Sequence, residues 1–101
     1  MSKKQLESSE WQGRLQTFTS GNRHRKAAIA ANGMTVIENT PLVSVDYDPP
    51  GKGNCLTITL AGFTHTVNAP VELYLSEEAN GVISTLEVVD QNGESTLLRL
   101  L

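Results

Sequence analysis

Residues 82–101, VISTLEVVDQNGESTLLRLL, predict a β-hairpin that ends the chain. A two-residue Asn92-Gly93 loop would place Leu98 opposite Glu87 and mix apolar with charged side chains on both faces. A three-residue loop that ends in a Gly93 bulge shifts the pairing by one residue. The register then pairs Leu86 with Leu98, Val88 with Thr96, Ser84 with Leu100 and Thr85 with Arg99. Because a slip of one residue turns every side chain to the other face, the apolar pattern favours the bulged turn.

Several shorter runs upstream also predict β-structure. Residues 26–37 suit a hairpin around the Asn32-Gly33 turn, although their alanines also favour helix. Pro41 is expected to mark a strand boundary. Alternation of apolar and polar residues predicts strands at 42–47, 55–60, 63–67 and 71–75. Strands at such short spacing, each followed by a turn, indicate an antiparallel sheet.

One helix, about residues 10–20, is predicted before the strands. Ser9-x-x-Gln12 matches a capping box, and Gly21-Asn22 supplies a C-terminal stop. The apolar face of this helix contains Trp11, Leu15 and Phe18. Residues 1–7 are expected to form a disordered tail. The predicted fold class is α+β: an N-terminal helix packed on an antiparallel sheet of about six or seven strands that ends in the C-terminal hairpin, with residues 8–101 as a single domain.

Size and composition indicate a folded, soluble protein. The chain has 101 residues, with 39% hydrophobic and 19% charged residues, which suits one domain with a modest core. No apolar run approaches the roughly 20 residues that span a bilayer, and the polar N-terminus does not resemble a secretory signal. The single cysteine, Cys55, cannot form an internal disulfide. We therefore expect a cytoplasmic protein without a membrane partner.

The net charge of -3 conceals a strong asymmetry. Residues 1–26 carry six Lys or Arg against two Glu, a net +4, and residues 27–101 carry two against nine acidic residues, a net -7. The basic segment either docks on acidic strands, its own or those of a second copy, or recruits a phosphate-bearing partner. We favour the first interpretation. A homodimer is also plausible because Leu97 and Leu101 fall on the face opposite Leu98 and Leu100.

The C-terminal half contains Thr64-His65-Thr66-Val67, followed by Ala69-Pro70 and Val71–Leu75, and then Leu86-Glu87-Val88, Asn92-Gly93 and Thr96–Leu100. This pattern resembles an uncharacterised family of small bacterial domains. The Trp11 helix and Pro41-Leu42 also fit, so the likeness covers roughly residues 10–101, whereas the basic residues 23–26 depart from it. The family has no known function. The resemblance implies one compact domain in a bacterial protein and no particular catalytic residue.

His65 is the first candidate for chemistry. It lies between Phe63 and Val67 at a spacing of two, so all three side chains should share a face. If that face is the core, His65 is a buried or half-buried imidazole with a nearby hydrogen-bond partner, which is the interpretation we favour. The alternative makes it a general base in a small enzyme. That alternative requires a pocket and a carboxylate within hydrogen-bond reach.

The sequence contains no pattern typical of a metal or cofactor site. His24, His65 and Cys55 show no recognisable ligand spacing, and no calcium loop is present. Gly51-Lys52-Gly53 is not a phosphate loop, because the spacing and the following helix are missing. We therefore expect no metal and no cofactor, and Cys55 is best interpreted as an inert thiol.

The basic stretch is the second candidate site and consists of Arg23, His24, Arg25 and Lys26. Such a cluster suits contact with an anion or with nucleic-acid phosphates. However, the remaining chain is acidic and has only 5% aromatic residues, so nucleic-acid binding is disfavoured against a solvated loop. We predict a non-enzymatic binding or interaction module with an unidentified protein partner. The alternatives are an anion or nucleic-acid contact at 23–26 and a small enzyme centred on His65.

Overall fold

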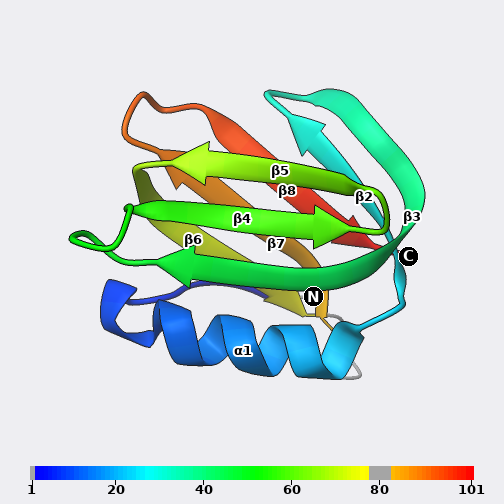
Figure 1. Cartoon of the computed structure of the whole chain (residues 1–101), viewed down its shortest axis with the longest axis horizontal. Helices are drawn as coiled ribbons and strands as arrows, with labels where there is room; N and C mark the ends of the chain where they lie inside the picture. The colour runs from blue at the N-terminus through cyan, green and yellow to red at the C-terminus, as the bar shows by residue number, and fades with distance from the viewer. Residues whose placement is uncertain (1, 78–82) are drawn as a thin grey trace.

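In the described residues, an α-helix, a short 3-10 helix and a strongly bent antiparallel sheet make up the fold (Figure 1). The structure is a computed structural model that describes residues 2–77 and 83–101. Met1 of the expected tail and Val82 of the quoted hairpin lie outside the described residues. The elements are β1 (Ser2–Gln5), the short 3-10 helix η1 (Ser8–Glu10), α1 (Trp11–Asn22), β2 (Lys26–Ala31), β3 (Met34–Asp48), β4 (Cys55–Leu60), β5 (Phe63–Asn68), β6 (Pro70–Glu77), β7 (Ile83–Asp90) and β8 (Ser95–Leu100).

Over the described residues, eight strands pair in the order β1-β6-β7-β8-β2-β3-β4-β5. The sheet bends at β3, because the first half of this strand pairs with β2 and the second half pairs with β4. Figure 1 shows the result: β3, β4 and β5 form a layer in front of β6, β7, β8 and β2, and α1 runs along one open side. The predicted α+β class is confirmed, with eight strands instead of six or seven.

Pro41 lies within β3 and does not end it, so the predicted boundary is wrong. Two features near this residue explain the bend. Asn39 adopts a left-handed conformation (φ 56°) within an irregular stretch of the β2–β3 pairing, and such irregularities bend a strand. Pro41 has no N–H to donate, and beyond it the pairing continues with β4. The proline therefore marks the point at which β3 changes partner.

The hydrophobic core lies between the two layers and is closed by α1. Apolar side chains alternate inward along each strand, as the spacing of Leu56, Ile58 and Leu60 in β4 predicts. The predicted hairpin register is also confirmed, with Leu86 opposite Leu98 and Val88 opposite Thr96. The back layer contributes Ala27, Ile29, Leu73, Leu75, Leu86, Val88, Leu98 and Leu100; the front layer contributes Leu42, Val45, Leu56, Ile58, Leu60 and Val67.

Helix α1 covers the open side of the core with the predicted face. Trp11, Leu15 and Phe18 are all buried, whereas the helix continues through Gly21 and ends at Asn22, two residues beyond the predicted end. The predicted capping box at Ser9 and Gln12 is wrong. The 3-10 turn moves the start of the helical segment upstream, and there the backbone N–H of Glu7 donates to Glu10 Oε1 at 3.2 Å.

The N-terminal residues differ most from expectation. Residues 2–7 do not form a disordered tail, because β1 pairs with β6 and extends the sheet by one strand. Leu6 is 3% exposed, its N–H donates to Leu73 O at 2.8 Å, and its carbonyl accepts from Trp11 Nε1 at 3.0 Å. The order of this segment therefore depends on partners 5 to about 70 residues away, which local sequence patterns do not record.

Candidate functional site

A surface cleft of about 660 Å³ lies where the C-terminal half of α1 faces the ends of β6 and β7. We call it the helix–sheet cleft. Its lining combines an apolar floor with charged side chains. The floor is formed by Phe18, Leu75 and Ile83, and the charged residues are Arg14, Arg25 and Glu77.

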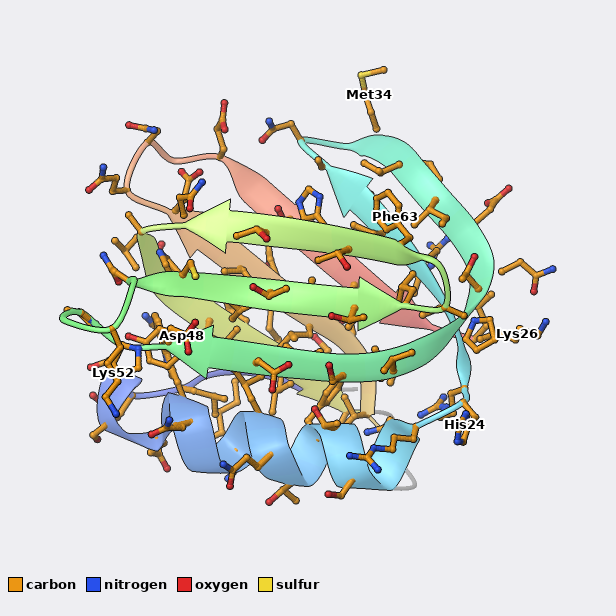
Figure 2. The ribbon with its side chains drawn as sticks, in the orientation of Figure 1. His24, Lys26, Met34, Asp48, Lys52 and Phe63 are labelled. Carbon is orange, nitrogen blue, oxygen red and sulfur yellow. The ribbon has the colours of Figure 1, made fainter. Side chains whose placement is uncertain are left out.

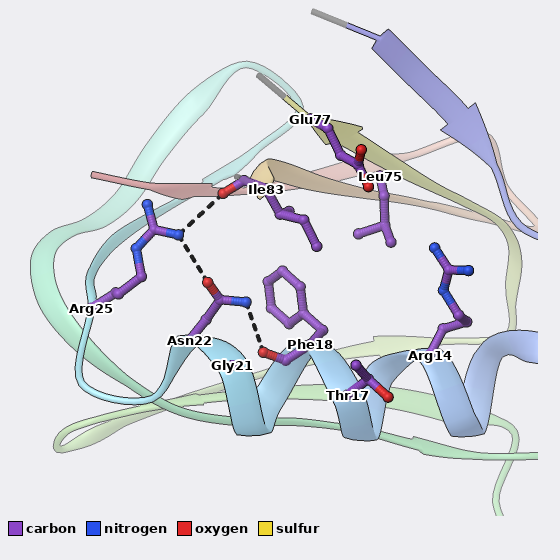
Figure 3. Close-up of a pocket in the computed structure, with 9 residues that line it drawn as sticks. All are labelled: Arg14, Thr17, Phe18, Gly21, Asn22, Arg25, Leu75, Glu77 and Ile83. Carbon is purple, nitrogen blue, oxygen red and sulfur yellow. Dashed lines mark hydrogen bonds between the residues drawn. The ribbon is translucent and has the colours of Figure 1, made fainter. Parts of the chain in front are cut away.

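The helix places Arg14 and Phe18 on the same side because they are four residues apart. Arg25 enters from the segment that connects α1 to β2. Figure 3 shows Arg14 and Arg25 on opposite sides of the cleft, with the floor between them. Two positive groups therefore flank an apolar surface.

A chain of hydrogen bonds holds Arg25 in place. Asn22 Nδ2 donates to Phe18 O at 2.8 Å, which orients the Asn22 amide, and Arg25 Nη1 donates to Asn22 Oδ1 at 2.8 Å. The same nitrogen also donates to Ile83 O at 3.2 Å (Figure 3). Both acceptors are neutral, so they fix the guanidinium without cancelling its charge. Asn22 is 8% exposed, and this burial adds to the rigidity of the arrangement.

The structure divides the predicted basic stretch into two parts. Arg23, His24 and Lys26 are exposed, whereas Arg25 is half-buried and belongs to the helix–sheet cleft. Figure 2 shows His24 and Lys26 pointing away from the body of the protein, His24 after the end of α1 and Lys26 at the start of β2. His24 also has a left-handed backbone (φ 71°), which reverses the chain between the helix and β2. The four residues therefore do not form one continuous basic surface.

His65 is half-buried in β5, on the same face as Phe63 and the buried Val67. Its Nε2 lies 3.4 Å from the hydroxyl of Thr96 on β8, so the imidazole connects the front and back layers. It lines a second cleft of about 310 Å³ that also contains Asp90. The Oδ1 atom of Asp90 accepts the backbone N–H groups of its own turn. Among the described residues, no carboxylate oxygen is within hydrogen-bond distance of His65.

Cys55 and the two histidines are not brought together. The Cys55 thiol is half-buried and lies 3.8 Å from Asp48 Oδ2. In residues 2–77 and 83–101, no three His, Cys, Asp or Glu side chains are grouped so as to hold a metal ion.

Sequence reasoning did not find the helix–sheet cleft, because its residues come from three separate segments. Phe18 was assigned to the core face of the helix, Leu75 and Ile83 belong to different strands, and Arg25 was grouped with its basic neighbours. One signal was available. Lys26 begins a segment with strand character, in which successive side chains alternate in direction, so Arg25 should point away from Lys26.

The fold and the cleft define a small α+β domain in which one helix closes a bent antiparallel sheet. The chain belongs to a family of unknown function, DUF5335, whose model matches residues 2–101. It is 37% identical over 65 residues to an uncharacterised protein of Aquifex aeolicus (strain VF5). That match covers 63% of this chain and 56% of the Aquifex protein, so the chain corresponds to little more than half of that relative. No solved structure matches the chain.

None of the helices in the part of the chain that the structure describes is both long and apolar enough to cross a membrane.

Proposed function

We propose that the protein is a non-enzymatic binding module and that the helix–sheet cleft is its binding site. The observation that carries this proposal is the combination of an apolar floor with a fixed guanidinium in a cleft of about 660 Å³. Small-molecule sites typically have volumes of about 300–1,000 Å³, mostly apolar walls and a few well-placed polar groups. The helix–sheet cleft fits this description.

The surroundings of His65 support binding over catalysis. A general base in a small enzyme is usually oriented by a carboxylate or by a comparable acceptor. His65 instead lies beside a threonine hydroxyl, and its cleft has about half the volume of the helix–sheet cleft. The enzyme alternative therefore has less support than the binding module.

The proposal can be tested by NMR with ¹⁵N-labelled protein and a panel of small fragments. We expect amide shifts to cluster at Gly21, Leu75 and Ile83, which line the cleft. Thr17→Trp places a large side chain in the cleft and should abolish these shifts. Gln12→Trp makes the same change at an exposed position of the helix away from this lining and should leave them intact.

Two results would contradict the proposal. One is a panel in which no fragment shifts amides of the cleft. The other is a set of shifts that is identical in Thr17→Trp and in the unmodified protein, because binding would then occur elsewhere.

A further inference from the structure

We infer that the helix–sheet cleft selects small organic anions with an apolar body, such as alkyl carboxylates, and that Arg25 anchors the anionic group. This inference rests on the proposed function, since it names the class of ligand for the same cleft. Three features of the cleft carry it: the free donors of Arg25, the balance of charge and the apolar floor.

Arg25 retains donors for a ligand. A guanidinium has five N–H donors, and both recorded bonds of Arg25 use Nη1. Among the described residues, Nη2 and Nε have no recorded hydrogen-bond partner. A carboxylate accepts two parallel N–H bonds from a guanidinium, which gives both strength and direction. Because Asn22 and Ile83 already fix the Arg25 side chain, little conformational entropy is lost when a ligand binds.

The charge of the described lining favours an anion. The described lining contains two positively charged residues, Arg14 and Arg25, and one negatively charged residue, Glu77, so its net charge is +1. Both arginines are half-buried, so their field is screened less by salt than that of exposed residues. Arg14 lies across the cleft from Arg25 and adds to the positive potential.

Because the floor of the cleft is apolar, a ligand that fits it needs an apolar part as well as a charged group. Ile83 is half-buried and leaves the most apolar surface open of the three floor residues, because Phe18 and Leu75 are only 2% and 4% exposed. Covering such surface contributes roughly 25 cal/mol per Å² of apolar area removed from water. An inorganic anion gains nothing from this floor, and a neutral alkyl chain gains nothing from Arg25. A ligand that combines the two groups satisfies both.

Octanoate, 1-octanol and acetate separate these contributions. We expect octanoate to shift amides of the cleft in NMR titrations and to bind at least about tenfold more tightly than octanol or acetate. Arg25→Gln should weaken octanoate binding by about tenfold or more. Arg25→Lys keeps the charge without the planar fork and should restore part of the affinity. Arg23→Gln removes the same charge from an exposed neighbour and should have little effect.

The possible failures are distinguishable. Equal binding of octanol and octanoate in the cleft would overturn the anion selectivity but would leave the binding module in place. Octanoate binding that survives Arg25→Gln, or that shifts amides elsewhere, would overturn the role of Arg25. A thermal melt of each variant shows whether it is folded. If Arg25→Gln is unfolded, octanoate binding by Arg25→Lys is compared with binding by the unmodified protein instead. If no fragment of the panel binds in the cleft, the proposed function itself is contradicted.

Discussion

Lys3 and Glu87 form an ion pair on the outer face of the back layer, with Lys3 Nζ 2.7 Å from Glu87 Oε1. The lysine reaches across β6 to do so, since β1 pairs with β6 and not with β7. Its ammonium also lies 4.7 Å from the centroid of the Tyr74 ring. Part of the basic N-terminal segment is thus complemented by acidic strands of the same chain, in agreement with the interpretation that we favoured from the charge asymmetry.

This pair predicts a pH-dependent contribution to stability. The hydrogen bond from Lys3 holds the pKa of Glu87 below its usual value, with a smaller contribution from Ser95 and against the effect of burial. Because the pKa is lower in the folded state, the stabilisation is present above the usual glutamate pKa of about 4.3 and is lost as the pH falls through the folded value. Lys3→Ala should therefore lower the free energy of unfolding at pH 7 by up to about 1 kcal/mol.

Urea denaturation at pH 7 and at pH 3 checks this prediction. The difference between Lys3→Ala and the unmodified protein should shrink as the pH falls through the lowered pKa of Glu87. Lys4→Ala is the matched control, because Lys4 is the exposed neighbour in β1. A difference as large at pH 3 as at pH 7 would assign the effect of Lys3 to the Tyr74 ring and not to Glu87.

Removal of the Thr19 hydroxyl should have a larger effect on stability, because this hydroxyl joins the helix to the edge of β3. Its Oγ1 accepts the backbone N–H of Val45 at 3.0 Å and donates to Val45 O at 3.2 Å, and both residues are buried. Thr19→Val keeps the shape of the side chain but leaves these two backbone groups without a partner. The free energy of unfolding should fall by about 1–3 kcal/mol.

Thr17→Val is the matched control for Thr19. The Thr17 hydroxyl donates to Gly13 O within the exposed face of the same helix, where water can replace the bond. This substitution should change stability by less than about 0.5 kcal/mol in the same thermal or urea measurements. Equal losses in both variants would mean that the helix propensity of valine dominates and that the contact with Val45 contributes little.

The elements that the sequence predicts well are those in which local chemistry and burial agree. The C-terminal hairpin is one, because the turn residues and the alternation of Leu86 and Val88 select the same register. Strand β1 is the opposite case, since its residues SKKQ have no apolar period and become ordered by pairing with β6. The bend of β3 at Pro41 depends on two different neighbouring strands. Both features arise from long-range pairing.

The candidate site depends on the same kind of information. Its residues lie up to 69 positions apart, from Arg14 to Ile83, and no local motif contains them. What the sequence does predict is the set of apolar positions and the excess of positive charge after α1. Arg25 is the one of the four basic residues 23–26 that turns toward the protein, because Asn22 and Ile83, at the start of β7, accept its hydrogen bonds.

Replacement of glycine by alanine should have opposite effects on stability at Gly93, in the turn of the C-terminal hairpin, and at Gly13, in α1. Gly93 has φ 81°, and its N–H donates to Asp90 O at 3.0 Å within the tight turn. Nothing lies within 4 Å of a Cβ at Gly93 or at Gly13, so the available space does not distinguish them. The left-handed backbone does, because a Cβ there costs about 1–2 kcal/mol.

Gly93→Ala should therefore lower the free energy of unfolding by about 1 kcal/mol, and Gly13→Ala in α1 should raise it by about 0.5–1 kcal/mol. Thermal melts of the two variants, compared with the unmodified protein, give the signs directly. A stabilised Gly93→Ala protein would be inconsistent with the bulged turn, which requires a left-handed residue at this position.

Leu6 provides the most direct test of the ordered N-terminus. A disordered tail predicts no effect of Leu6→Ala, whereas the observed burial at 3% exposure, next to the Leu73 and Trp11 contacts, predicts a loss of about 2–5 kcal/mol. Leu101→Ala is the matched control, because Leu101 is 60% exposed and should change stability by less than about 0.5 kcal/mol. Urea denaturation followed by Trp11 fluorescence suits the experiment, since the indole donates to Leu6 O. If Leu6→Ala unfolds at the same urea concentration as Leu101→Ala, the burial of Leu6 contributes nothing to stability, and the contacts of Leu6 with Leu73 and Trp11 do not hold the N-terminal segment on the fold.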